Sequence, residues 1–428
     1  MEDILDLADR LWRGATDIVG HHPLGGGGDL VEVVPGVAYV ASFARVSAFK
    51  TGDGLVLVDT GSELAASQIH TAIRGWAPAG TDNRLNTAVF SHGHIDHVFG
   101  VGVFEEEARS NSWTAPAVVA HEAMPARFDR YRMTAGYNAI INRRQFGVSK
   151  LDWPTEYRYP DQTYRERLEL EVGGRAFELH HARGETDDHT WTWIPDSRIL
   201  CPGDLFIWST PNAGNPQKVQ RYPLEWARAL RTMSELSAEV LLPGHGFPVV
   251  GVDRVQRALS TTAELLESLV GQVIEMMNSG CGLNEIIHSV EVPADLLALP
   301  WLRPVYDEPE FVVRNTWRQY GGWYDGDPSS LKPAPAGRLA SELADLAGGA
   351  NRLAARAEAL LAGGSDTDYR LAGHLAELAM LAAPDDPAIH RVRAAVFSAR
   401  VEAETSTMAK GIFRAAAYQS RARHEERT

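Results

Sequence analysis

The sequence predicts an α+β protein in which a sandwich of two β-sheets, covered by helices, precedes an all-α domain. Within residues 31–250, two series of short apolar runs with strand character alternate with helical segments, and each series ends on histidine or acidic residues. Sheets and helices of this kind bury their apolar faces against one another in layers. Residues 337–425 are instead rich in alanine, leucine, glutamate and arginine and have no strand pattern, which indicates a bundle of amphipathic helices.

The length of 428 residues exceeds the usual size of a single domain, so we expect at least two. The first, over residues 1–300, contains all the strand-like segments. A linker is predicted over 301–336, where glycine and proline are frequent, and the helical domain follows over 337–428.

Charge and cysteine content exclude several classes of function. The 41 basic and 56 acidic residues give a net charge of −15. This charge argues against nucleic acid and anionic membranes as partners, because both attract basic proteins. Two cysteines, Cys201 and Cys281, are too few for a disulfide framework. Since the N-terminus lacks a signal-peptide pattern and no apolar run approaches the roughly 20 residues of a membrane span, we expect a cytoplasmic protein.

The first half of the predicted sandwich begins after a helix over 4–14 and a glycine-rich loop. That loop carries His21 and His22, which we expect to be solvated. Strands are predicted at 31–34, 37–43, 46–50, 55–58, 86–90 and 117–120, and a helix at 63–76. The Thr-Gly-Asp-Gly sequence at 51–54 is typical of a hairpin turn. Residues 123–165 are predicted to form a helical or looped insertion.

The second half repeats the pattern of strands and helices. Strands are predicted at 177–181, 190–194, 199–201 and 240–243, and helices at 224–236 and 254–277. Pro223 stands where a helix start tolerates proline. Glycines at 363–364 and prolines at 384 and 387 divide the C-terminal bundle into shorter helices.

Four potential metal ligands, His92, His94, Asp96 and His97, follow the predicted strand at 86–90 directly. Imidazole and carboxylate groups suit zinc and similar metals. His92 and His94 are two residues apart, so in an extended backbone their side chains point the same way. Asp96 and His97 come after a turn and can face a second ion. The cluster therefore predicts a site for one or two metal ions.

Three further candidates each follow a predicted strand. Glu185, Asp204 and His245 occupy such strand ends, and strand ends on one edge of a sandwich can meet at a common site. Taken singly, each is an ordinary loop residue. Their shared placement favours the reading that they complete the metal site, with His189 in a supporting role.

Ser-His-Gly-His-Ile-Asp-His at 91–97 resembles the histidine signature of the metallo-β-lactamase superfamily. Asp59, Asp204 and His245 match other positions of that superfamily, and Glu185, where most members have histidine, resembles the alkyl sulfatase branch. The stretch 142–147 is similar to the Arg-Arg insertion of that branch, and 311–328 to the lead-in to its helical dimerisation domain. Within residues 1–428 we expect no counterpart of the sterol-carrier-like domain of the larger members.

The resemblance implies an αββα metallo-β-lactamase sandwich, a helical dimerisation domain and a dinuclear zinc hydrolase, with iron or manganese as other metals. It assigns His92, His94 and Glu185 to one ion, Asp96, His97 and His245 to the other, and Asp204 to a bridge between them. Asp59 would orient the ligand turn. A metal-bridging hydroxide would attack a small-molecule substrate, with Asp96 and Asp204 counted as catalytic. The dimerisation domain implies a homodimer or larger homo-oligomer.

A sulfate ester is the substrate that this branch implies, but two family histidines near the leaving group are missing. Neither 206–212 nor 311–315 contains histidine. Arginine could bind a sulfate instead. The substrate-binding candidates are Asn142, Arg143, Arg144, Trp208 and Arg314. Alternatives are another activated ester or an aryl ether, an iron persulfide dioxygenase, and a non-catalytic partner subunit; a full ligand set for two ions counts against the last two.

Overall fold

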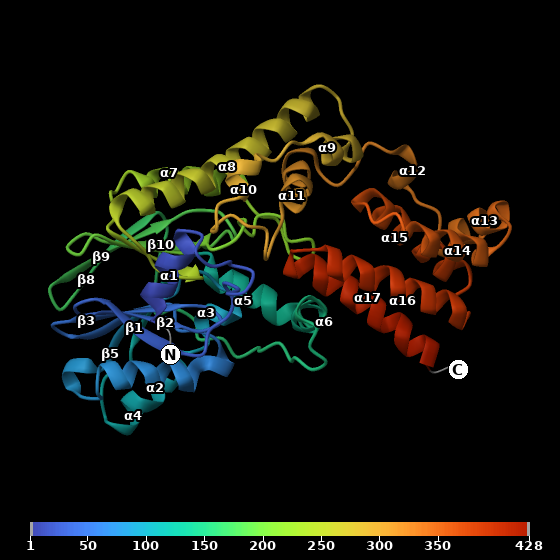
Figure 1. Ribbon diagram of the computed structural model, residues 1–428. Coiled ribbons are helices and arrows are strands. Elements are labelled where there is room, and N and C mark those ends of the chain that lie inside the picture. Colours follow the sequence, from blue (N-terminus) through green and yellow to red (C-terminus); the bar gives the residue numbers. More distant parts are fainter. Residues whose placement is uncertain (1–2, 426–428) are drawn as a thin grey trace. The chain divides into compact units, whose positions relative to one another are not determined.

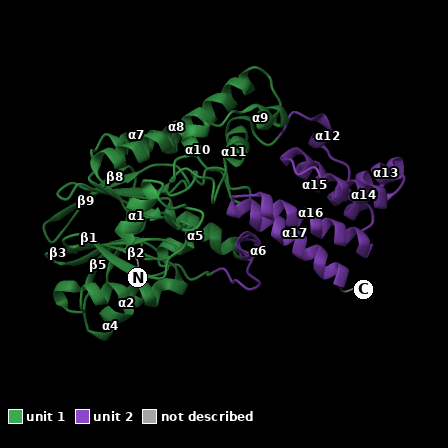
Figure 2. Cartoon of the chain, in the orientation of Figure 1, with its two compact units in different colours: residues 1–135, 154–323 green, residues 136–153, 324–428 purple. Residues whose placement is uncertain are grey.

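The computed structural model describes residues 3–425 as two compact units (Figure 2). One unit comprises the residues up to 135 together with 154–323. The other comprises 136–153 and the residues from 324 onward. The division at 323/324 falls inside the stretch 301–336 that the sequence predicts to be a linker, and the predicted domain boundaries remain a prediction.

The first unit contains two β-sheets (Figure 1). The seven-stranded sheet has its strands in sequence order: β1 (Asp29–Val34), β2 (Val37–Ala41), β3 (Val46–Thr51), β4 (Gly54–Val58), β5 (Leu85–Val89), β6 (Ala117–His121) and β7 (Gln162–Tyr164). The six-stranded sheet has the order β13–β12–β11–β10–β9–β8, with β8 (Arg167–Val172), β9 (Arg175–His181), β10 (Thr190–Ile194), β11 (Ile199–Ile207), β12 (Val240–His245) and β13 (Val249–Val250). These sheets confirm the predicted sandwich.

An apolar core lies between the two sheets. Because side chains alternate across a strand, Val56 and Val58 of β4 face this core together with Phe177 and Leu179 of β9. All four are buried. The rings of Phe49 and Phe177, one from each sheet, meet edge to face with their centroids 5.5 Å apart. The core holds the two sheets face to face and so fixes the strand ends of both.

Helices cover the outer faces of both sheets, as predicted (Figure 1). The first sheet is covered by α2 (Ala66–Trp76) and α4 (Gly102–Ser110), and the second by α7 (Pro223–Ser234) and α8 (Val252–Asn278). Trp226 of α7 is completely buried, and its indole N–H donates a hydrogen bond to the Leu205 carbonyl oxygen at 2.6 Å. The N-terminal helix α1 (Ile4–Trp12) packs into the same apolar cluster. This unit also contains the α-helices α3 (Ile95–Val98), α5 (Met124–Met133), α9 (Leu283–Ser289), α10 (Ala294–Leu297) and α11 (Pro309–Gly321).

The structure is more regular than the sequence predicts in three places. The insertion at 123–165 contains α5, α6 (Ala135–Phe146) and the edge strand β7. Strand β11 extends to Ile207, well beyond the predicted end at 201. The predicted linker contains α11 and α12 (Pro328–Leu331). Strand β11 runs through Pro202 and Gly203, and α12 has no buried residue, so neither has the apolar pattern that marks an element in the sequence.

The second unit is helical, as predicted for the C-terminal part of the chain. Its long helices are α13 (Ala336–Ala347), α14 (Ala350–Leu360), α15 (Asp366–Ala382), α16 (Pro387–Ala403) and α17 (Thr407–Glu425). Gly348 ends α13 in the left-handed conformation (φ 86°), and the Ser365 and Asp386 side chains cap the starts of α15 and α16. Within residues 3–425, every helix is too short or too polar to cross a bilayer.

Candidate metal centre

The histidine-rich turn after β5 is held in place by Asp59. This residue follows β4 with a positive φ of 59°. Its carboxylate accepts hydrogen bonds of 2.7 Å from both the backbone N–H and the hydroxyl of Ser91. The same carboxylate lies 2.7 Å from Nδ1 of His97, whose Nε2 therefore points away from it. The orienting role expected for Asp59 thus has a geometric basis, since one carboxylate positions both ends of the turn.

The structure brings all seven candidate ligands together in two adjacent groups. One group comprises His92, His94, Glu185 and Asp204, and the other Asp96, His97 and His245; within each group, one potential ligand atom per residue lies within 4.8 Å of the others. His92 Nε2 is 3.4 Å from Glu185 Oε2. In the second group, His245 Nε2 is 3.4 Å from Asp96 Oδ2.

Asp204 lies between the two groups. Its Oδ2 is 3.7 Å from His92 Nε2 and 3.3 Å from His245 Nε2, and its Oδ1 is 3.4 Å from His97 Nε2. The sequence placed Asp204 after a strand, but it lies within β11, where the pairing with β12 is irregular. The register shifts on either side of Gly203, whose φ is +54°, and a Cβ at this position would lie 2.7 Å from His189 Nε2.

Three buried polar atoms of these residues face the cluster without a hydrogen-bond partner. Among the buried side-chain atoms of residues 3–425, His97 Nε2, Glu185 Oε2 and Asp204 Oδ1 have no hydrogen-bond partner. Leaving such atoms unsatisfied is costly. A metal ion would satisfy them, so the nitrogen and oxygen donor set fits the metal that the sequence predicts.

Burial and neighbouring charges shift the pKa values of the four histidines in opposite directions. Burial lowers the pKa values of His92 and His94 well below the ordinary value, and neighbouring positive charges add to this effect. Both rings are therefore neutral, the form that binds a metal. Burial also disfavours charge on His97 and His245, but Asp204 and other carboxylates raise both pKa values, that of His245 to about 9. The Nδ1 atom of His245 lies 2.7 Å from the Phe43 carbonyl oxygen, which leaves Nε2 facing the cluster.

Glu185 is held by Arg221, which sequence reasoning missed. Both side chains are almost completely buried, and Arg221 NH1 lies 2.7 Å from Glu185 Oε1 and 2.7 Å from the Glu185 carbonyl oxygen. The Asn212 amide also donates to Oε1. With Oε1 occupied, Oε2 is the atom that faces His92 and His94. Burial raises the pKa of Glu185, and Arg221 opposes this by stabilising the carboxylate. No periodic pattern marks a buried arginine in a loop, so only its charge could have drawn attention to it.

Other buried polar residues surround the candidate ligands. His189 is completely buried, its ring stacks on His92 with centroids 4.8 Å apart, and its Nε2 lies 3.0 Å from the Pro202 carbonyl oxygen. Arg127 and Lys218 join Arg221 as positive charges that lower the pKa of His94. Sequence reasoning singled out neither Arg127 nor Lys218.

The substrate-binding candidates lie in different parts of the chain. Asn142, Arg143 and Arg144 belong to α6 in the second unit, where Asn142 donates to the Asn138 carbonyl oxygen and Arg143 to that of Leu151. Arg314 lies on α11 and pairs with Glu310, 3.1 Å away on the same helix.

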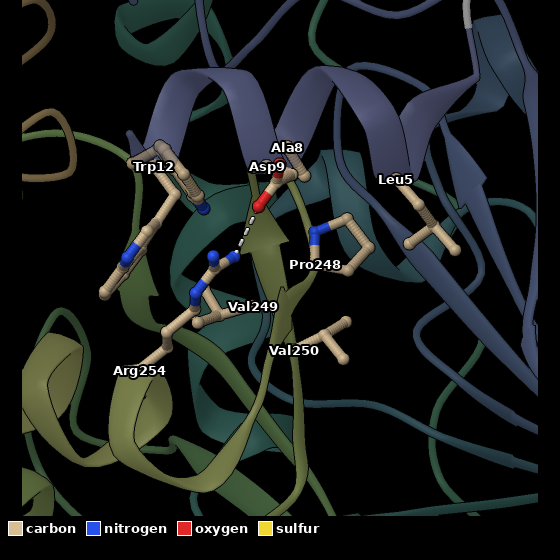
Figure 3. A pocket seen from close by; sticks show the side chains of 9 residues that line it. Leu5, Ala8, Asp9, Trp12, Pro248, Val249, Val250 and Arg254 are labelled. Carbon is tan, nitrogen blue, oxygen red and sulfur yellow. Dashed lines mark ion pairs between the residues drawn. The ribbon is translucent and has the colours of Figure 1, made fainter. Parts of the chain in front are cut away.

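Trp208 is completely buried, and its indole N–H donates to the Phe247 carbonyl oxygen at 2.8 Å. With residues of α1, β13 and α8, it lines a small cavity of about 260 Å³, shown in Figure 3. The ion pair between Asp9 and Arg254 (2.9 Å) borders this mainly apolar cavity. None of the seven candidate ligands lines it.

Two family models match the chain. Residues 40–245 match the metallo-beta-lactamase superfamily, and residues 282–423 match alkyl sulfatase dimerisation. The first match covers every candidate ligand from His92 to His245.

Curated relatives are similar over most of this chain. A linear primary-alkylsulfatase from a Pseudomonas species is 26% identical over 81% of this chain and 68% of its own length. An (R)-specific secondary-alkylsulfatase from Pseudomonas is 26% identical over 83% of this chain and 57% of its own length. An alkyl/aryl-sulfatase from Saccharomyces cerevisiae is 23% identical over 64% of this chain and 46% of its own length. The chain thus spans about half to two thirds of the length of these relatives.

The fold matches a solved structure closely. A stereoselective inverting secondary alkylsulfatase from a Pseudomonas species superposes with a TM-score of 0.81 at 22% sequence identity, over 92% of this chain and 66% of that one.

Proposed function

Because this chain belongs to the alkyl sulfatase-like branch of the metallo-β-lactamase superfamily, we propose that it is a dinuclear zinc hydrolase of sulfate esters. His92, His94 and Glu185 would hold one ion, Asp96, His97 and His245 the other, and Asp204 would lie between them. When bound, the ions would activate water as the nucleophile and stabilise negative charge on the substrate. The protein's own contribution is to fix the ligands and to bind the substrate.

Positively charged side chains beside the ligand cluster are the observation that favours an anionic substrate. Three carboxylates among the candidate ligands would offset only part of the charge of two divalent ions. Arg221 and Lys218 add positive charge on the loop that follows β11, close enough to lower the pKa of His94. A positively charged site attracts an anionic ester and stabilises a departing anion. Lys218, which is only partly buried, is thus the better-placed of the two to bind a sulfate, because Arg221 is already paired with Glu185.

A hydrolysis screen of the purified, metal-loaded protein tests this proposal. Alkyl sulfates and aryl sulfates are expected to be hydrolysed, and the activity should disappear in the His94→Ala variant. Because residues 205–222 contain no histidine that could protonate a leaving group, the screen includes neutral activated esters and aryl ethers. If only these neutral compounds were hydrolysed, the substrate would be an activated ester or an aryl ether rather than a sulfate ester. Metal analysis that finds stoichiometric iron, or no metal, would contradict the dinuclear zinc site.

We also propose that the helical unit assembles the protein into a homo-oligomer. Leu339, Leu343 and Leu346 of α13 are 50%, 38% and 79% exposed, and their spacing places them along one face of the helix. An exposed apolar stripe of this kind is typical of an interface. The match of 282–423 to alkyl sulfatase dimerisation supports a second copy of this chain as the partner.

The Leu343→Glu variant is expected to shift the protein from an oligomer to a monomer, because burying a charge at the centre of the stripe is costly. Light scattering coupled to size-exclusion chromatography measures the mass. Leu64→Glu is the matched control, since Leu64 is 98% exposed but lies in the first unit. An oligomer that survives Leu343→Glu would rule out this face as the interface.

A further inference from the structure

We propose that Asp188, with Arg127 as its charge partner, is a positioning residue that fixes the His92–Gly93–His94 turn for one of the two metal ions. The inference rests on the metal site proposed above. It concerns residues that are not candidate ligands and that the match to known families does not assign.

Asp188 anchors the backbone between two candidate ligands. Its side chain is completely buried, and its Oδ2 accepts a hydrogen bond of 2.9 Å from the Gly93 N–H. Gly93 separates His92 from His94, so a rotation of this peptide would move both imidazole rings. The ring nitrogens involved, His92 Nε2 and His94 Nδ1, are 2.7 Å apart, which leaves little tolerance for such a movement.

Asp188 also connects two loops that carry candidate ligands. It lies three residues after Glu185, in the loop between β9 and β10, whereas Gly93 lies in the turn after β5. The bond from Gly93 to Asp188 therefore ties the strand ends of the two sheets together. Asp188 thereby links three of the four members of one ligand group, namely His92, His94 and Glu185.

Arg127 compensates the buried charge of Asp188. The guanidinium, from α5 in the insertion, places Nε 2.8 Å from Asp188 Oδ1, and both side chains are buried. A buried carboxylate without such a partner would be strongly unfavourable. Arg127 also pairs with Asp187, whose side chain is 43% exposed. The pair packs directly on the turn: a Cβ at Gly93 would lie 2.7 Å from Arg127 Cδ and 3.1 Å from Asp188 Oδ2.

The other ligand group is oriented by different contacts. His97 is held by Asp59, and His245 by the Phe43 carbonyl oxygen. Loss of the Asp188 contact should consequently affect one ion much more than the other. A residue that only stabilised the fold would not distinguish between them.

The test is a titration of the metal-free protein with Co²⁺ in competition with a chromophoric chelator, followed also by the visible cobalt spectrum. Wild type is expected to bind two ions. Asp188→Ala should weaken one of them about 10- to 100-fold, as is typical when a residue that orients ligands is removed, and leave the other unchanged. Asp187→Ala is the matched control: it removes the exposed partner of the same arginine and should bind both ions as wild type does.

A second variant keeps the test decisive if the alanine protein does not fold. Asp188→Asn keeps the shape but can satisfy only one of the two contacts, with Gly93 or with Arg127, so an intermediate loss at the same ion is expected. Wild-type affinity for both ions in the Asp188 variants overturns the proposal. So does an equal loss at both ions that is accompanied by a lower melting temperature of the metal-free protein.

The same titration separates this inference from the proposed function. If the wild-type protein binds no Co²⁺, both the proposed metal site and the positioning role of Asp188 are refuted. A wild-type protein that binds two ions but hydrolyses no sulfate ester refutes the proposed activity, whereas a selective loss in Asp188→Ala would still establish the positioning role.

Discussion

Replacing Asp204 with alanine is expected to remove both metal ions from the protein and to lower the rate of hydrolysis by about a thousandfold or more. Asp204 lies between the two groups: its carboxylate is 3.3–3.7 Å from nitrogens of His245, His97 and His92. In the proposed two-ion site, its loss would leave each ion with fewer donors and would remove a negative charge between them. The loss of bound metal should therefore exceed that caused by removing a histidine from either group, which would mainly affect one ion.

Metal content after dialysis and initial rates under substrate saturation measure this effect. Asp196→Ala is the control, since this carboxylate is 47% exposed and pairs with Arg175 at the surface. Asp204→Ala should retain the secondary structure of the wild type, because the lost group contacts candidate ligands rather than the apolar core. A variant that kept two ions and wild-type activity would show that the two groups are not joined by Asp204.

The fold could be predicted from the sequence wherever burial has a simple period. The hairpin at 46–58 and the helices at 224–236 and 254–277 have clear patterns, and the structure contains β3, β4, α7 and α8 there. Very short or interrupted strands were harder to predict. Strand β7 has three residues and lies at a sheet edge, and β11 continues through Pro202 and Gly203, which ordinarily interrupt a strand.

The residues of the candidate site were likewise only partly predictable from the sequence. His92 to His97 are adjacent in the chain, so their proximity follows from the sequence alone. Glu185, Asp204 and His245 were placed near them by their positions at strand ends and by resemblance. The sequence could not predict that Arg127 and Arg221 lie at the site. An arginine in a polar segment is expected at the surface unless its buried partner is known. In the structure both are buried against carboxylates at or beside the cluster.

The Arg221→Met variant is expected to lose about 3–5 kcal/mol of unfolding free energy in the metal-free protein, because it leaves the Glu185 carboxylate buried without its counter-charge. Both side chains are 2% exposed or less, and their closest atoms are 2.7 Å apart. Urea unfolding in the presence of a chelator measures the loss. Arg231→Met is the matched control: Arg231 also pairs with a glutamate, Glu267 at 2.6 Å, but this pair is about 40% exposed, so a loss of about 0–1 kcal/mol is expected.

Combining Arg221→Met with Glu185→His should restore most of this stability. Buried histidine is neutral and needs no counter-charge, and it is a good zinc ligand. The single Glu185→His variant instead leaves the Arg221 charge unpaired beside the ions, so it should lose both stability and metal. A double-mutant cycle is therefore expected to give a coupling of about 2–3 kcal/mol. Additive losses would mean that Arg221 stabilises the loop through the Glu185 carbonyl oxygen alone, and that a glutamate at this position does not depend on a buried arginine.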